Sequence, residues 1–186
     1  MNVSPGRGAD NESIAADKIL SDCRISLSKL FNIDKPNQII FTLNCSDALN
    51  TALKGVLKPG DHVIISAFEH NSVVRPLRFL EKFGVEVSTA VGCGAEGIIE
   101  PEVIKKHIKK NTKLIAVLHG SNVTGAIQPI EEVGSISKEN GILFLVDAAQ
   151  TAGIYNIDVE KQNIELLAFA GHKSLMGPMG TGGLYI

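Results

Sequence analysis

Lys173 is the residue with the clearest chemical potential, because it follows the apolar run 166–170 and precedes the glycine-rich stretch GPMGTGG at 177–183. A lysine amine that is desolvated beside positive neighbours has a lowered pKa, and its neutral form can attack an aldehyde. The glycines would let the backbone approach a bound small molecule closely. A lone loop lysine is usually only solvated, so its interpretation depends on the residues that accompany it.

Asp147 ends the apolar run 142–146. Burial of a carboxylate there is costly unless a cation or hydrogen bonds compensate. A protonated pyridine nitrogen would be such a cation, and a protonated pyridine ring is an electron sink. Alternatively, Asp147 only caps the turn 148–153. The sequence leaves both interpretations open.

Several other polar side chains could also take part in such a site, but each is less specific than Lys173 or Asp147. The turn 44–47, Asn-Cys-Ser-Asp, enters a predicted helix whose first amides point outward, so that with the Ser46 hydroxyl it could hold a phosphate or simply be an ordinary helix cap. His70 could stack on a flat heteroaromatic ring, and His172 could donate to a phosphate. Single histidines are more often ordinary surface or core residues.

The elements that must position these residues alternate between strand and helix. A helix is predicted from Asp10 to about Phe31, with Asp10 or Asn11 as its cap. Short apolar runs follow at 38–43, 62–67, 85–90, 114–118, 142–146, 166–170 and 182–186, mostly separated by helical patterns. The predicted fold is α/β, with three α/β/α layers around a mostly parallel sheet.

Ligands of such sheets bind outside the carboxyl ends of the strands. Five runs deliver polar residues to that edge: 44–47, 69–71, His119 with Ser121 and Asn122, Asp147 with Gln150, and 172–173. Ser46 is predicted to cap a helix that stops at 59–60, and Pro101 and Pro129 suit first helical turns. No repeat, charge run or linker marks a boundary, so the chain reads as one domain or part of one.

Composition excludes several classes of protein. The chain has 186 residues, with 18 basic and 20 acidic side chains and a net charge of −2, and it lacks a basic block for nucleic acid. Its longest apolar runs have five residues, and its first residues form no apolar signal segment. We therefore expect neither secretion nor a membrane span.

The three cysteines, Cys23, Cys45 and Cys93, are far apart and form no even disulfide framework. A reducing cytoplasm is the expected location. Each thiol is expected to be buried or structural.

Several stretches together resemble the class V aminotransferase family of fold-type I enzymes that use pyridoxal phosphate (PLP). The similarity extends from about Pro5 to Ile186 and is strongest to the branch of cysteine desulfurases and selenocysteine lyases. The matching stretches are NCSDALN, GDHVIISAFEHNSVVRPL, HGSNVTGAIQPI, VDAAQTAG and FAGHKSLMGPMGTGGLYI.

The resemblance implies a role for each matching residue. Lys173 would hold PLP as a Schiff base and act as a catalytic base, Asp147 would pair with the pyridine nitrogen, and His70 would stack on the ring. The remaining cofactor contacts would come from Gln150 and Asn122 near the phenolic oxygen and from Cys45, Ser46 and His172 around the phosphate. Asn44 and Ala170 depart from the family pattern, which often has glycine and serine there.

The resemblance also implies the reaction and the partners. Residues 1–186 would be the large PLP-binding domain, incomplete at both ends, without the small C-terminal domain that carries an arginine for the substrate carboxylate and the desulfurase cysteine. The parent enzyme would convert cysteine to alanine and a persulfide, as a homodimer that passes sulfur to an acceptor protein. Selenocysteine lyase, aminotransferase and a non-catalytic PLP-binding fragment remain alternatives.

Two unrelated sites compete with this interpretation. Residues 92–97 spell G-x-G-x-x-G, which is typical of dinucleotide binding, but the next helix is predicted to start only near Pro101. His70, His119, Asp147 and His172 would share one sheet edge and could surround a metal, yet no closely spaced ligand pair supports this. A serine hydrolase is disfavoured because the G-x-S-x-G motif is missing.

Overall fold

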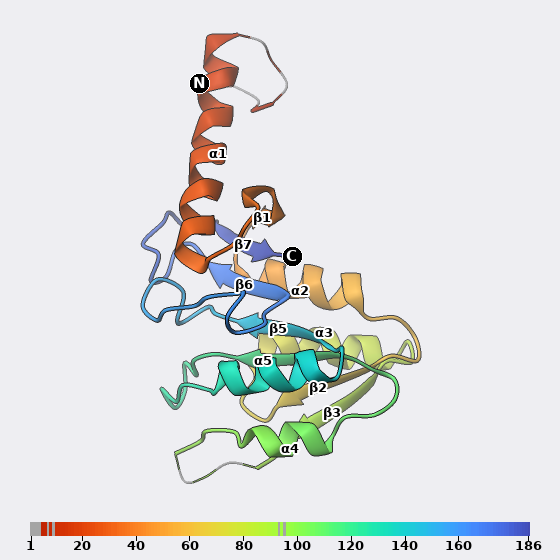
Figure 1. The fold of residues 1–186 in the computed structure, drawn as a ribbon. Helices are drawn as coiled ribbons and strands as arrows, with labels where there is room; N and C mark the ends of the chain where they lie inside the picture. Colours follow the sequence, from red (N-terminus) through yellow and green to blue (C-terminus); the bar gives the residue numbers. More distant parts are fainter. Residues whose placement is uncertain (1–4, 7, 9, 93, 95) are drawn as a thin grey trace.

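The computed structural model describes residues 5, 6, 8, 10–92, 94 and 96–186. They contain one seven-stranded sheet of order β1-β7-β6-β5-β4-β2-β3 (Figure 1). The strands are β1 (Ile39–Thr42), β2 (His62–Ser66), β3 (Glu86–Ala90), β4 (Thr112–Leu118), β5 (Leu143–Asp147), β6 (Leu166–Ala170) and β7 (Gly182–Tyr185). Strand β7 lies between β1 and β6 and runs antiparallel to both. The predicted mostly parallel sheet is confirmed.

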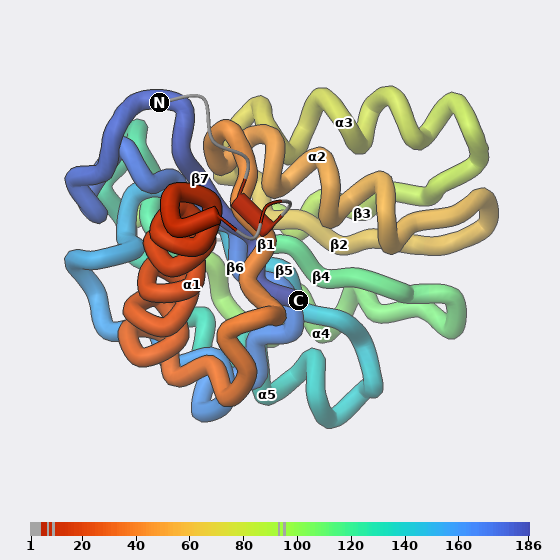
Figure 2. Tube along the Cα trace, turned by 90° about the horizontal axis from the view of Figure 1, so that it is seen from above, coloured from red at the N-terminus to blue at the C-terminus, as the bar shows by residue number. Residues whose placement is uncertain are grey.

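Helices cover both faces of the sheet, as Figure 2 shows. Helices α2 and α3 lie on one face, and α1, α4 and α5 lie on the other. The helices are α1 (Asn11–Phe31), α2 (Cys45–Val56), α3 (Asn71–Glu81), α4 (Pro101–Lys106) and α5 (Ile130–Glu139), with a short 3-10 turn η1 (Pro36–Gln38). The expected three layers are therefore present.

The central strands are apolar on both sides because both sides are covered. In β4, Leu114 and Ala116 pack in the cluster beneath α2 and α3, whereas Ile115 and Val117 pack in the cluster beneath α4 and α5. Side chains alternate across a strand. Two covered faces therefore require the continuous apolar runs seen in the sequence.

Helix α1 is capped by Asp10, whose side chain accepts a hydrogen bond from the Ser13 amide at 2.8 Å. Only its C-terminal part joins the core, through Phe31, while Ile14 and Ile19 are 56% and 70% exposed. The helix projects beyond the sheet (Figure 1), so its apolar positions do not form one buried face. Among the described residues, no helix has the length and apolar character needed to cross a bilayer.

Two predicted helix starts need correction. The cap of α2 is Asn44, whose side chain accepts from the Asp47 amide at 2.9 Å, and Ser46 lies one residue inside the helix. Asn44 can cap because its backbone is extended before the first turn. Pro129 precedes the first residue of α5, whereas Pro101 does begin α4.

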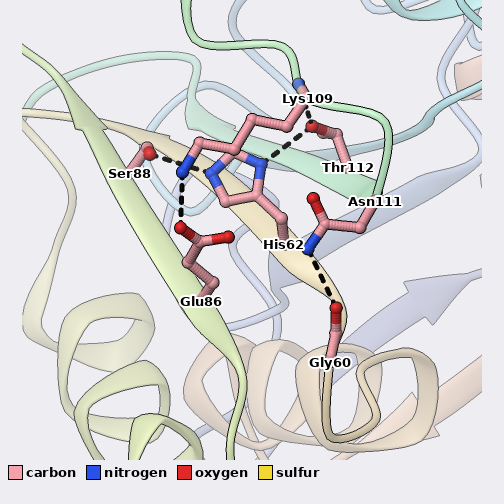
Figure 3. Close-up of polar contacts among 7 residues, drawn as sticks. All are labelled: Gly60, His62, Glu86, Ser88, Lys109, Asn111 and Thr112. Atoms are coloured by element: carbon pink, nitrogen blue, oxygen red, sulfur yellow. Dashed lines mark hydrogen bonds and ion pairs between the residues drawn. The ribbon is translucent and has the colours of Figure 1, made fainter.

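A polar cluster closes the sheet at the amino ends of β2, β3 and β4 (Figure 3). His62 is fully buried, and its two ring nitrogens lie 2.8 Å from the hydroxyls of Thr112 and Ser88. Above the ring, Lys109 pairs with Glu86 at 2.5 Å. The end of the sheet opposite to the expected site is therefore sealed by internal contacts.

Candidate active site

The carboxyl ends of the strands surround a cavity of about 330 Å³. Eight predicted site residues line it: Cys45, Ser46, His70, Asn122, Asp147, Gln150, His172 and Lys173. They come from the ends of β1, β2, β4, β5 and β6 and from the loops that follow. The structure thus brings together every residue that the sequence proposed for this site, although their roles remain predictions.

The turn into α2 is held in place by β7. A side chain at Gly182 would meet backbone atoms of Asn44 at 2.6 Å, so β7 approaches this turn as closely as glycine allows. The Asp47 carboxylate accepts from the Leu43 amide at 3.1 Å and tightens the same turn. The first amides of α2 are consequently fixed at the wall of the cavity.

The Ser46 hydroxyl takes part in a network with α3. It lies 2.5 Å from the Ser72 hydroxyl, which in turn lies 2.9 Å from Nδ1 of His70. The Ser72 amide donates to the same Nδ1 at 3.1 Å, so His70 is the cap of α3. Because Nδ1 accepts this bond, a neutral His70 carries its proton on Nε2.

The Asp147 carboxyl is buried and caps the following turn, which is one of the two interpretations from the sequence; its pairing with a cationic ring nitrogen remains a prediction. Its Oδ1 accepts from the Ala149 amide at 2.9 Å and so caps the following turn. Burial raises the pKa of Asp147, although this amide bond acts in the opposite direction. No described residue donates to Oδ2, which leaves a buried carboxylate short of one partner at the cavity wall.

The sequence interpretation placed Cys45 around the phosphate. In the structure its thiol points to Asp147 instead. It donates to Oδ1 of Asp147 at 3.3 Å and is 6% exposed. The side chain packs in the core cluster beneath α2 and α3. Cys23, expected to be buried or structural, is exposed on α1, and Cys93 lies outside the described residues.

Lys173 is solvent-exposed, contrary to the expected desolvated amine, because its turn forms the rim of an open cavity. The Met176 amide donates to the Lys173 carbonyl at 2.9 Å and closes that turn. His172 donates from Nδ1 to the Thr181 carbonyl at 3.3 Å, which leaves Nε2 for a ligand. The glycine-rich stretch folds back on this turn, with the Gly177 amide 2.7 Å from the Gly171 carbonyl.

Glu69 was assigned no role from the sequence, yet its carboxyl is buried beside the site. Its Oε1 accepts from the Ser66 hydroxyl at 2.5 Å and from the Leu118 amide at 3.0 Å, whereas Oε2 is buried without a partner among the described residues. Burial raises the pKa of Glu69 to about 8. The signal in the sequence was an acid at the end of a buried strand, directly before His70.

His119, like Glu69, has a buried polar atom for which the described residues offer no partner. Its Nδ1 is buried without a partner among the described residues, and its ring contacts Tyr155 edge-on. Burial lowers the pKa of His119 to about 4. In the part of the chain that the structure describes, no group of three or more His, Cys, Asp or Glu side chains is arranged to hold a metal.

Comparison with known proteins decides the family. The sequence model of the family described as "Aminotransferase class-V" matches residues 1–186.

The chain belongs to the class V aminotransferase family.

The curated relatives of this class V chain include cysteine desulfurases. It is 40% identical over 156 residues to "Cysteine desulfurase IscS" of Dictyoglomus turgidum, a match covering 82% of this chain and 39% of the relative. It is 36% identical over 185 residues to "Probable cysteine desulfurase" of Methanothermobacter thermautotrophicus, covering 99% of this chain and 46% of the relative. The chain therefore spans less than half the length of these relatives.

Solved structures agree with this assignment. The structure titled "SspA in complex with cysteine" has a TM-score of 0.91 and 32% identity, and the match covers 98% of this chain and 53% of that one. The apo cysteine desulfurase from Thermococcus onnurineus NA1 has a TM-score of 0.89 and 37% identity, covering 100% of this chain and 46% of that one. The class V fold is thus shared over nearly the whole chain.

The family implies PLP, and the cavity suits it. Its volume of about 330 Å³ is within the range of small-molecule sites. A cationic ring nitrogen would compensate the buried Asp147 carboxylate, whose Oδ2 has no donor among the described residues. The α2 amides with Ser46 offer donors to a phosphate, and the Lys173 amine lies at the rim.

The G-x-G-x-x-G stretch stays outside this site. Its described glycines, Gly92, Gly94 and Gly97, follow β3, and helix α4 begins only at Pro101, as predicted. The dinucleotide motif requires a helix that opens directly from the glycines, because the helix amides bind the pyrophosphate. This arrangement does not meet that requirement.

Proposed function

We propose that this chain forms the PLP site of a cysteine desulfurase. The observation that carries the proposal is the buried carboxylate of Asp147, which faces the same cavity as the Lys173 amine and the first turn of α2. The names of the relatives support cysteine as the substrate. A homodimer, an acceptor protein for sulfur and a cytoplasmic location complete the proposal.

When bound here, PLP would supply an aldehyde carbon that captures amines and a ring that withdraws electrons from the Cα of an amino acid. Lys173 would hold the cofactor covalently through Nζ and, once released by the substrate amine, would accept the Cα proton. Asp147 would keep the ring nitrogen protonated through Oδ2. His70 would cover one face of the ring and restrict its tilt.

The remaining residues would orient the two ligands. Ser46, the α2 amides and Nε2 of His172 would hold the phosphate, and Gln150 and Asn122 would donate to the phenolic oxygen. Asn122 would also approach the substrate carboxylate. A thiolate other than Cys23, Cys45 or Cys93 would take the substrate's sulfur and leave alanine.

The test is covalent mapping of the cofactor. Purified protein is mixed with PLP, reduced with borohydride, digested and analysed by mass spectrometry, and the pyridoxyl group is expected on Lys173. Lys173→Ala should remove the adduct without unfolding the protein, whereas Lys105→Ala, on the far helix α4, should keep it. An adduct on another lysine in wild-type protein would show that the assignment is wrong.

A second assay concerns residues 1–186 by themselves, which we expect to form no alanine from cysteine. Transfer of sulfur needs a thiolate positioned at the substrate's sulfur, and positioning supplies much of the rate. Cys45 is 6% exposed and bonded to Asp147, so it is not available for this. Sustained alanine formation that disappears in Cys45→Ser would place the nucleophile in the α2 turn instead.

A further inference from the structure

Cys45 is a buried thiol that the proposed reaction does not use. It is the first residue of α2 and lies 102 positions before Asp147 in sequence, yet its Sγ is 3.3 Å from Asp147 Oδ1. Both residues line the cavity. The contact therefore joins the turn proposed for the phosphate to the carboxylate proposed for the ring nitrogen.

The two oxygens of Asp147 have different surroundings. Oδ1 accepts from the Cys45 thiol and from the Ala149 amide at 2.9 Å. Among the described residues, nothing donates to Oδ2. Two donors on one oxygen fix the rotation of a carboxylate, because rotation about the Cβ–Cγ bond would break both hydrogen bonds. The other oxygen then remains available to a ligand.

The thiol is suited to be a donor and not a nucleophile. Burial, and then the neighbouring charge of Asp147, raise the pKa of Cys45 well above its ordinary value. A thiol in such surroundings stays protonated and is inert. Its S–H is therefore present for the hydrogen bond to Oδ1 at neutral pH.

We propose that Cys45 is a positioning residue, whose thiol holds Asp147 in the rotamer that presents Oδ2 to the ring nitrogen of PLP. The inference rests on the proposed function. Loss of the thiol leaves the Ala149 amide as the one described donor to Oδ1, which loosens the carboxylate and weakens its contact with the cofactor. The α2 turn thus orients the ring end of the site as well as the phosphate end.

Three substitutions separate a hydrogen bond from simple packing. Cys45→Ser keeps a donor, Cys45→Val fills the space without one, and Cys45→Ala lacks both donor and volume. Dissociation constants of PLP, measured by absorbance titration, should be within about 2-fold of wild type for Ser and about 3- to 10-fold weaker for both Val and Ala, as for loss of one hydrogen bond. If affinity followed volume, with Val like wild type and Ala weakest, the proposal would be overturned.

A second readout needs neither cofactor nor turnover. The infrared S–H stretching band of Cys45, assigned by difference from Cys45→Ser in cofactor-free protein, should shift to higher frequency in Asp147→Asn because an amide oxygen is a weaker acceptor. It should not move in the exposed control Asp34→Asn. An unchanged band in Asp147→Asn would refute the contact. Wild-type protein that takes up no PLP would instead overturn the proposed function, and the band would still report on the contact.

Discussion

The two ends of the parallel strands differ in whether their buried polar atoms have hydrogen-bond partners. At the amino ends, both ring nitrogens of buried His62 have hydroxyl partners, and the amide of exposed Asn111 donates to the Gly60 carbonyl at 2.9 Å (Figure 3). At the carboxyl ends, the described residues include three buried polar atoms without partners: Glu69 Oε2, His119 Nδ1 and Thr151 Oγ1. Asp147 adds a carboxylate with one oxygen left over.

We interpret this difference as one between polar groups that stabilise the fold and polar groups that are available to a ligand. A buried polar atom without a partner costs about 1–3 kcal/mol, so such atoms are rare in a finished core. Three of the four such atoms among the described residues belong to Glu69, His119 and Thr151, which adjoin cavity-lining residues in the sequence, and the fourth is Ser137 Oγ on α5. The cluster around His62 has its hydrogen bonds made, whereas the carboxyl ends keep unused hydrogen-bonding capacity, of which Oδ2 of Asp147 lies at the cavity wall.

Asp147→Asn, at the carboxyl ends of the strands, should have the largest effect, and we expect it on the rate of Cα proton exchange. A neutral pyridine is a poor electron sink, so exchange of the Cα proton of cysteine in heavy water, followed by NMR, should slow by about three orders of magnitude or more. The cofactor-free variant should be at least as stable as wild type at neutral pH, because burial raises the pKa of the wild-type carboxyl and its charge is costly. Exchange at the wild-type rate would show that Asp147 has another role.

His62→Ala should destabilise the fold at the amino ends of the strands and leave the cavity at their carboxyl ends unchanged. It leaves the hydroxyls of Ser88 and Thr112 without their ring partner and opens a cavity, so the free energy of unfolding should fall by about 2–4 kcal/mol. Denaturant unfolding measures this, and PLP affinity should be unchanged. Weaker PLP binding by the folded variant would contradict the separation of the two ends.

His62 should also make the free energy of unfolding depend on pH. Burial, and then the charge of Lys109, lower the pKa of His62 below its ordinary value of 6.5. The unfolded chain therefore takes up a proton before the folded one does, and this contribution to stability is lost as the pH falls below about 6.5. His119, whose pKa is lowered to about 4, acts in the same direction, so His62→Ala should reduce the acid slope without abolishing it.

Glu69→Gln should sharpen the comparison by replacing a buried carboxyl, whose ionisation destabilises the fold, with a group that cannot ionise. The folded pKa of about 8 lies above the ordinary value of 4.5, so the folded state keeps a proton that the unfolded state releases. Wild-type stability should therefore fall between these values as the pH rises, by at most about 1.4 kcal/mol per pH unit for one proton. The neutral variant should lose this slope and be the more stable protein at pH 8 and above.

The measurement is thermal unfolding of Glu69→Gln and wild type across this range, with exposed Glu100→Gln as the control. Parallel stability curves for Glu69→Gln and wild type would mean that Glu69 is ionised in the folded protein at neutral pH, and the assignment of a neutral carboxyl would fail.

Lys109→Ala should have the smallest effect. Its ion pair with Glu86 lies above the buried ring, but both partners are largely solvent-exposed, and exposed pairs contribute little. The melting temperature should change little, and less as salt is added. A loss as large as that of His62→Ala would mean that the ion pair, and not the hydroxyl contacts, holds this end together.

Much of this arrangement was predictable because it follows from local patterns. The apolar runs predicted seven strands, and the structure has a strand at each of them. Polar residues directly after those runs predicted the contents of the cavity, since parallel strands bring their carboxyl ends to one edge. The cap of α2 was missed because asparagine and serine compete at neighbouring positions, and only the extended backbone at Asn44 settles which one caps.

The sequence by itself therefore determined the fold class, the family and the eight predicted residues that line the cavity, since each depends on residue type and spacing along the chain. Tertiary structure alone decided how those residues meet. It turned the Cys45 thiol towards Asp147, buried the Glu69 carboxyl and left Lys173 at an open rim. Burial and hydrogen-bond partners are properties of packed neighbours from distant segments, and they set side-chain direction and pKa in a way that no local pattern encodes.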